Sequence, residues 1–208
     1  MPAIIRFTCA LDPIYGGVPR GVSMISKETS NRGLSTSIVS CGNSRSALRR
    51  SKSERALLNS LRIKVLTSRA LFSNPYGIGG FIGLALRISK LEKPKLIVLH
   101  QIWSFSTLLG FLYSRLCHVK LAIMPHGSLS HYHQLRSKHI KKVATHLFIE
   151  KALMSANHIV VTSGLEKSEL ESKLAKKAII IPYGSDITIP KSVNKIDGRI
   201  IFAGRITK

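Results

Sequence analysis

Short apolar runs rich in β-branched residues alternate with longer segments of helical spacing along most of this chain. Several runs, such as LIVL, IVV and AIII, are apolar throughout, which is typical of strands covered on both faces of a parallel sheet. Strands are predicted over residues 3–10, 34–40, 61–66, 95–100, 119–124, 157–162 and 178–181. Helices are predicted over residues 22–32, 79–91, 105–116, 138–154 and 165–175. This alternation indicates right-handed crossovers, so we expect an α/β fold with an open, mostly parallel Rossmann-like sheet and helices on both faces.

Two helix-terminus signals support this reading. Gly33 follows the first predicted helix, where a left-handed C′ residue is expected. Ser163 and Glu166 have the spacing of a capping box at the start of the last predicted helix.

Two segments interrupt the alternation and define the domain organisation. Residues 42–53, GNSRSALRRSKS, are polar and basic without an apolar period, so we expect a mobile loop there. Residues 185–197 contain Pro190 and little periodicity, which is typical of a linker. The strand-like run RIIFA comes next. We therefore predict one domain over residues 1–184, a linker over 185–197 and the first strand of a truncated second domain over 198–208.

The charge balance is the outlying feature of the composition. The 208 residues include 32 Lys and Arg against 10 Asp and Glu, a net charge of +22. A small domain is expected to carry a net charge of about 2–8 in magnitude. Such an excess attracts polyanions, which include nucleic acids, anionic membranes and phosphorylated substrates. The cysteines, Cys9, Cys41 and Cys117, are scattered, so we expect free thiols in a reducing cytosol.

No targeting or membrane-spanning segment is evident. The N-terminus has no charged region ahead of a long apolar stretch, so no secretory signal is expected. The best spanning candidate, residues 96–113, is interrupted by polar side chains such as His100 and Gln101, whereas a spanning helix needs roughly 18 apolar residues in a row. We predict a cytoplasmic protein and leave peripheral association with the inner face of the plasma membrane open.

Gly16 and Gly17 lie between the first predicted strand and the first predicted helix. Glycines there permit left-handed turns and let backbone amides approach a phosphate at a helix N-terminus. The segment is neither a G-x-G-x-x-G fingerprint nor a G-x-x-x-x-G-K-[ST] loop. A plain tight turn and a phosphate-binding loop therefore both remain open.

His126 lies in the segment Pro125-His126-Gly127-Ser128, directly after a predicted strand. Open α/β sheets bind ligands at this carboxyl edge, and a histidine there can bind a phosphate or hydroxyl or transfer a proton. A purely structural histidine is the alternative. Three further histidines follow without an acid or cysteine beside them, so we predict no metal site.

Taken in order, these segments resemble the N-terminal half of a GT-B glycosyltransferase of the family 4 type. The motifs that carry the resemblance are GGV after the first strand, NRG after the first helix, PHGSLS, VVTSGLEKSEL, IPYGSD and IFAGRITK. They span nearly the whole chain, and the last resembles the opening strand of the donor-binding domain. The sequence departs from the family in two ways: Tyr183 occupies a position that is usually Asn, and the downstream acidic motif that binds the nucleotide sugar is absent.

The resemblance implies a retaining, nucleotide-sugar-dependent glycosyltransferase in bacterial surface polysaccharide synthesis. The partners it implies are a nucleotide-sugar donor and a glycan or lipid-phosphate acceptor. The basic charge of the chain leaves an anionic membrane surface open as a further partner. The nucleotide sugar is a substrate, so no cofactor is expected, and the 208-residue chain alone is expected to be inactive. The backbone amides of the glycine pair would lie near the donor diphosphate, and the histidine beside the transferred sugar. The implied site residues are the catalytic His126 and the substrate-binding Gly16, Gly17, Gly127, Ser128 and Arg205.

A basic nucleic-acid-binding α/β module without enzymatic activity is the main alternative. Against it, only 6% of the residues are aromatic, and no zinc-finger spacing or RNA-stacking motif occurs. A Rossmann dehydrogenase is disfavoured because its fingerprint is absent. We therefore expect no nucleic-acid partner.

Overall fold

The computed structural model describes residues 3–69, 81–129 and 148–184. Within these residues, seven strands form one sheet in the order β3-β2-β1-β4-β5-β6-β7. Every described strand pair is parallel, which confirms the predicted Rossmann-like α/β sheet. The strands are β1 (Ala3–Thr8), β2 (Ser35–Asn43), β3 (Lys64–Arg69), β4 (Leu96–His100), β5 (Lys120–Met124), β6 (His158–Val161) and β7 (Ala178–Ile180).

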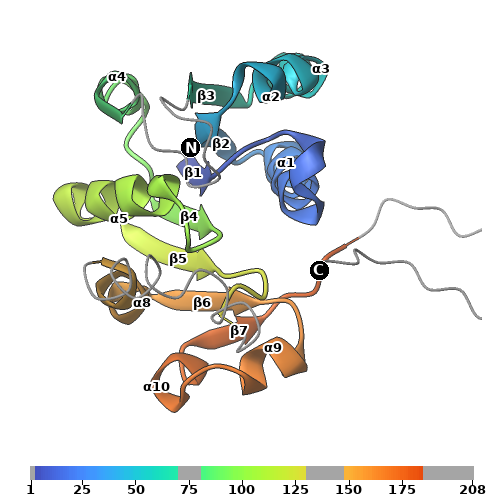
Figure 1. Cartoon of the computed structure of the whole chain (residues 1–208). Coiled ribbons are helices and arrows are strands. Elements are labelled where there is room, and N and C mark those ends of the chain that lie inside the picture. The colour runs from blue at the N-terminus through green and yellow to red at the C-terminus, as the bar shows by residue number, and fades with distance from the viewer. Residues whose placement is uncertain (1–2, 70–80, 130–147, 185–208) are drawn as a thin grey trace, which may run out of the picture.

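Helices cover both faces of the sheet, also as predicted (Figure 1). On one face, α1 (Gly17–Asn31) and α3 (Lys52–Ser60) bury apolar side chains. On the other face, α4 (Phe81–Ile88), α5 (Phe105–Cys117) and α8 (Glu150–Ser155) enclose the largest apolar core. The remaining helices are short: η1 (Pro13–Tyr15), α2 (Arg45–Arg50), α9 (Gly164–Ser168) and α10 (Ser172–Ala175).

The two faces of the central strand β1 differ in character. Phe7 is fully buried in the core beneath α5. Gly110 lets that helix approach closely, because an added Cβ there would lie 2.8 Å from the Phe7 ring. Arg6 faces α1 instead, and its Nη2 donates to Thr29 Oγ1 at 2.8 Å. Burial lowers the pKa of Arg6 to about 10. A buried polar pair therefore lies between α1 and β1, beside the apolar contacts of that helix with the sheet.

The strand order changes direction between β1 and β4. β2 and β3 lie on one side of β1, and β4 to β7 lie on the other. Ligands of open parallel sheets bind outside the carboxyl ends of the strands at such a switch point. The chain enters α1 after β1 and reaches His126 after β5, so both predicted ligand segments lie at this edge.

The prediction of a mobile loop over residues 42–53 is wrong. β2 extends to Asn43. The rest of the segment is mostly helical, because it contains α2 and the first residues of α3. Ser44 caps α2 by accepting a hydrogen bond from the Ala47 N–H at 3.1 Å. Arg50 Nε donates to the buried carboxylate of Asp12 at 2.8 Å, which attaches α2 to the loop after β1. A search for apolar periodicity does not detect α2, because this helix is stabilised by a cap and an ion pair and not by an apolar face.

Two helix boundaries also differ from the prediction. α1 begins at Gly17 rather than at residue 22, because Pro19 is compatible with the first turn of a helix. The predicted helix over residues 165–175 is two short helices, α9 and α10, separated by the three non-helical residues 169–171.

The end of α1 is as predicted. Gly33 has a φ of 77°, and its N–H donates to the Ser30 carbonyl at 2.9 Å. The Leu34 N–H donates to the Thr29 carbonyl at 3.2 Å, which completes a Schellman motif.

Some predictions lie outside the described residues. They concern the linker over 185–197, the strand after it with Arg205, the three further histidines and most of the helix predicted over 138–154. Residues 96–113 are divided between β4 and α5, and no helix of the described residues is long and apolar enough to span a membrane.

Candidate active site

His126 lies two residues after β5, at the carboxyl edge of the sheet. Its backbone φ is 54°, and Gly127 follows with a φ of 73°. A left-handed backbone is uncommon for a residue other than glycine and occurs often at ligand sites. These two consecutive left-handed residues turn the chain and hold the His126 ring, which is half-buried, at the edge where such sheets bind ligands.

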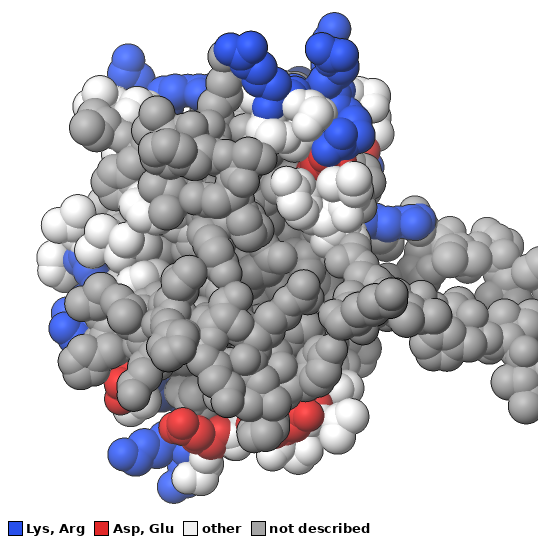
Figure 2. All heavy atoms as spheres, viewed as in Figure 1, with Lys and Arg blue, Asp and Glu red and all other residues white. Residues whose placement is uncertain are grey.

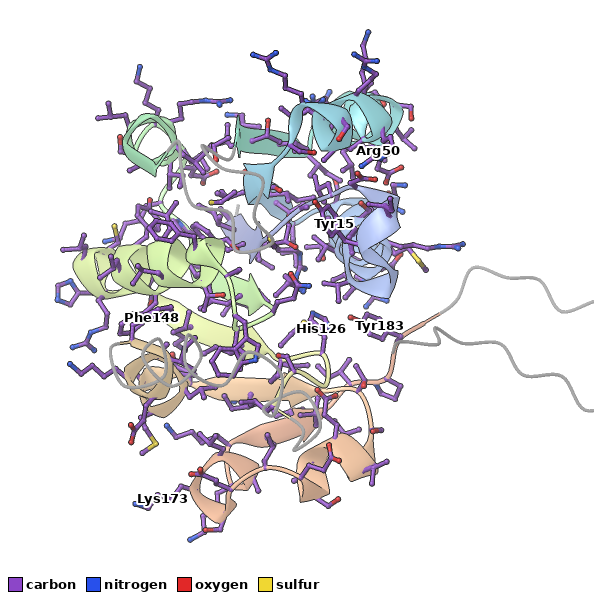
Figure 3. The ribbon with its side chains drawn as sticks, viewed as in Figure 1. Tyr15, Arg50, His126, Phe148, Lys173 and Tyr183 are labelled. Carbon is purple, nitrogen blue, oxygen red and sulfur yellow. The ribbon has the colours of Figure 1, made fainter. Side chains whose placement is uncertain are left out.

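Three aromatic rings from three strand ends stack at this point. His100 is the last residue of β4, and Tyr183 lies three residues after β7. The ring centroids of His100 and His126 are 5.3 Å apart, with planes inclined by 14°. Those of His126 and Tyr183 are 5.7 Å apart, with planes inclined by 11°, and the two side chains face one another in Figure 3.

Hydrogen bonds engage both ring nitrogens of His126. Its Nε2 lies 3.1 Å from Nδ1 of His100, and its Nδ1 is bonded to the hydroxyl of Tyr183. His100 is fully buried, and its own Nε2 has no partner among the described residues. A ligand that binds either nitrogen of His126 must therefore displace one of these two side chains.

Burial determines the charge of all three rings. It lowers the pKa of His126 to about 4, although the Glu166 carboxylate acts in the opposite direction. Burial, with smaller effects of His126 and Arg6, lowers the pKa of His100 well below its ordinary value. Burial and then Glu166 raise the pKa of Tyr183 to about 12. The rings are neutral at pH 7, so His126 is able to accept a proton but is not a cationic acid.

The carboxylate of Glu166 joins the loop after β5 to the start of α9. Its Oε1 accepts from the Gly127 N–H at 2.7 Å, and its Oε2 accepts from the Thr162 N–H at 2.7 Å. Ser163 Oγ accepts from the Glu166 N–H at 3.1 Å, which confirms one half of the predicted capping box. The other half is wrong, because the carboxylate bonds to Thr162 and Gly127 instead of the Ser163 N–H. The Gly127 N–H is thereby used within the protein.

The N-terminus of α1 presents backbone donors to the site. Gly16, with a φ of 91°, is the N-cap, supplies no side-chain hydrogen bond, and no acid lies in the first turn. The N–H groups of Gly17 and Val18 come before the first intrahelical bond, and Pro19 has no N–H. Such a terminus carries partial positive charge and attracts anions.

One cleft of about 560 Å³ connects these features. Its walls come from α1, the loop after β5, the start of α9 and the segment after β7. Residues that line it include Gly17, Arg20, His126, Gly127, Ser163 and Tyr183. An anion bound at the start of α1 would share this cleft with His126.

Ser128 lies beside this cleft, not in it. It lines a neighbouring cavity of about 300 Å³ that also reaches His126. The Ser128 hydroxyl donates to the Pro125 carbonyl at 2.5 Å, and the Ser128 carbonyl accepts from Trp103 Nε1 at 2.9 Å. These bonds fix the loop and occupy the hydroxyl.

The structure thus brings Gly17, His126 and Gly127 of the predicted site into one cleft, with Gly16 adjoining Gly17 as the cap. Ser128 lies in the neighbouring cavity, and Arg205 lies outside the described residues. The functional roles of all these residues stay predictions.

The sequence reasoning missed the partners of His126. The signal for His100 is its position at the end of a predicted strand, at the same sheet edge as His126. The sequence marks Tyr183 only as a departure from the family pattern, which does not indicate a contact with His126. In the described part of the chain, no group of three or more His, Cys, Asp or Glu side chains is arranged to hold a metal ion.

Comparison with known families decides what kind of chain carries this site. A model of Glycosyltransferase Family 4 matches residues 15–188, well over half of the chain. The chain belongs to glycosyltransferase family 4. This finding confirms the resemblance drawn from the motifs. No curated protein matches the chain.

Solved structures share the fold of this family 4 chain. Anabaena Alr3699/HepE in complex with UDP-glucose matches with a TM-score of 0.58 and 16% identity, over 89% of this chain and 45% of that one. A glycosyltransferase from Rickettsia africae matches with a TM-score of 0.57 and 18% identity, over 87% and 42%. A UDP-N-acetylglucosamine 2-epimerase from Rickettsia bellii matches with a TM-score of 0.52 and 10% identity, over 86% and 44%. The chain spans less than half the length of each of these proteins.

Proposed function

We propose that this chain is the acceptor-side part of a retaining glycosyltransferase that moves a sugar from a nucleotide-sugar donor to a glycan or lipid-phosphate acceptor. The observation that carries the proposal is the cleft, in which the uncapped N-terminus of α1 and His126 share one cavity in a family 4 chain. A role in bacterial surface polysaccharide synthesis belongs to the same proposal.

The donor diphosphate is assigned to the start of α1. The N–H groups of Gly17 and Val18 have no intrahelical partner, and the helix dipole adds positive potential there. As charge develops on the leaving diphosphate, preorganised donors of this kind stabilise it more than water would. Arg205, contributed from beyond the linker, is proposed to add a cation to the same phosphates.

The transferred sugar and the acceptor are assigned to the space beside His126. A neutral imidazole in a half-buried position is able to accept a hydrogen bond or a proton from a sugar hydroxyl that takes the place of Tyr183 at Nδ1. Alignment of donor and acceptor supplies a large part of enzymatic rate enhancement, about 7–11 kcal/mol in favourable cases. The proposal therefore requires a second, donor-binding wall, and the chain alone is expected to give no turnover.

Equilibrium binding tests the proposal. UDP-glucose and other nucleotide sugars are titrated against the chain, with duplex DNA of equal phosphate concentration as the alternative ligand. Gly17→Asp places a carboxylate at the start of α1, in a position where an added side chain meets no atom within 4 Å. It should weaken nucleotide-sugar binding about three- to tenfold.

Gly83→Asp in α4 is the matched control, because Gly83 also has free space around it and lies outside the cleft. The control should bind like the parent. Equal affinities of the two variants, or tighter binding of DNA than of every nucleotide sugar, would contradict the proposal.

A further inference from the structure

We propose that Tyr183 is a positioning residue for His126, holding its imidazole in one orientation and in the tautomer protonated at Nε2. This inference rests on the proposed function of the cleft and adds to it how the orientation and tautomer of His126 are fixed. It is carried by the ring stack, by the hydrogen bonds at both imidazole nitrogens and by the packing of Tyr183 on α1.

The packing on α1 fixes the position of the phenol ring. A Cβ on Gly21 would lie 2.7 Å from Cε1 and 3.3 Å from the hydroxyl oxygen of Tyr183. Any larger residue at position 21 would therefore displace the ring. Because Gly21 has no side chain, the phenol ring packs directly against α1 and lies between Gly21 and the imidazole of His126.

The direction of the hydrogen bonds follows from acid and base strength. A phenolic O–H is a better donor than an imidazole N–H, and an imidazole lone pair is a better acceptor than a phenolic oxygen. Tyr183 therefore donates to Nδ1 of His126. The single proton of the neutral imidazole is then on Nε2, which donates to Nδ1 of His100 at 3.1 Å.

Burial keeps the three rings neutral, and two charged groups flank them. The Glu166 carboxylate lies on the side of His126 and Tyr183, where it opposes ionisation of the phenol and favours protonation of the imidazole, an effect that burial outweighs. The guanidinium of Arg6 lies on the side of His100, where it opposes protonation of that ring. The hydrogen-bond chain therefore runs between one negative and one positive group with all three rings uncharged.

Nitrogen NMR of the histidine rings tests the proposal. In the 208-residue chain labelled with ¹⁵N-histidine at pH 7, Nδ1 of His126 should resonate as an unprotonated nitrogen that accepts a hydrogen bond, and Nε2 as a protonated one. Tyr183→Phe keeps the stacked ring but removes the donor. It should move the Nδ1 resonance of His126 toward that of a nitrogen that accepts no hydrogen bond. It should also lower the ratio of the Nε2-protonated to the Nδ1-protonated tautomer by about two- to tenfold.

Gly21→Ala tests the packing of Tyr183 on α1 without changing the chemistry of either ring. It should change the His126 signals in the same direction as Tyr183→Phe, because it pushes the phenol aside. Gly83→Ala and Tyr15→Phe are the controls and should leave those signals unchanged. Since Tyr183 is 44% exposed, its variant should keep the parent's melting temperature within a few degrees, and it decides the test even if Gly21→Ala fails to fold.

A wild-type His126 protonated at Nδ1, or His126 signals unchanged by Tyr183→Phe, would overturn the proposal. Neither readout depends on nucleotide-sugar binding. A failure here therefore leaves the proposed function standing, and a failure of ligand binding leaves this test intact.

Discussion

At the scale of single residues, the site depends on a histidine that the fold keeps uncharged. His126 is held between His100 and Tyr183, and burial lowers its pKa to about 4. In the unfolded chain, a histidine takes up its proton near pH 6.5. The unfolded state therefore binds more protons than the folded state between these two values, and the free energy of unfolding must fall as the pH is lowered from about 6.5 to about 4.

His126→Gln removes this contribution. Between pH 7 and pH 4, the parent should lose about 2–3 kcal/mol more of its free energy of unfolding than the variant does. Urea denaturation of both proteins at several pH values measures the difference, and each protein serves as its own reference at pH 7. Parallel pH profiles would mean that His126 titrates normally in the folded protein.

At the scale of elements, an ion pair attaches α2 to the loop after β1. The Asp12 carboxylate is buried; this burial alone would raise its pKa, but Arg50 and the Ile14 N–H outweigh it, so the pKa is lowered. Arg50→Ala should cost about 1–3 kcal/mol of unfolding free energy, because the half-exposed guanidinium leaves behind a buried carboxylate with fewer partners.

Arg49→Ala, one residue away in the same helix and exposed, is the matched control. It should change the unfolding free energy by less than about 0.5 kcal/mol. Thermal or urea unfolding compares the two variants. An equal effect of both would show that the pair with Asp12 contributes nothing particular.

The same helix shows how far the sequence could predict this fold. The strands of the sheet and the position of His126 follow from apolar runs and from one motif at a strand end, both of which are local signals. α2 has no apolar period, and its ion pair joins residues 38 positions apart. The bond between Tyr183 and His126 spans 57 positions. Contacts between strand ends depend on the strand order, which no local pattern specifies.

At the scale of the whole molecule, positive charge is unevenly distributed. On the face shown in Figure 2, Lys and Arg gather at the end formed by α2, α3 and α4. Exposed cations of this end include Arg45, Arg49 and Lys52. We propose that this end binds an anionic membrane surface, where a lipid-phosphate acceptor would lie. Lys138, Lys141 and Lys142 form a further basic group in the sequence and lie outside the described residues.

Replacing Arg45, Arg49 and Lys52 together with Gln should weaken binding to anionic vesicles about 10- to 100-fold at low salt, since each cation near such a surface contributes about 1 kcal/mol. The control replaces three exposed lysines at other places with Gln: Lys151 in α8, Lys173 in α10 and Lys176 at the end of α10. This control has the same net charge as the first triple variant and should bind like the parent. Vesicle sedimentation compares the three proteins. Equal loss in both triple variants would indicate a general charge effect without a docking surface.

The cleft between α1 and His126 is proposed to receive the phosphates of a nucleotide sugar. The most direct test of this proposal is a map of backbone amide shifts in the ¹⁵N-labelled chain during titration with UDP-glucose. The Gly17 and Val18 amides should shift most and saturate together with the His126 ring signals, while amides of α10 stay fixed. Unshifted amides at the start of α1, with changes confined to α2 and α3, would contradict the proposal.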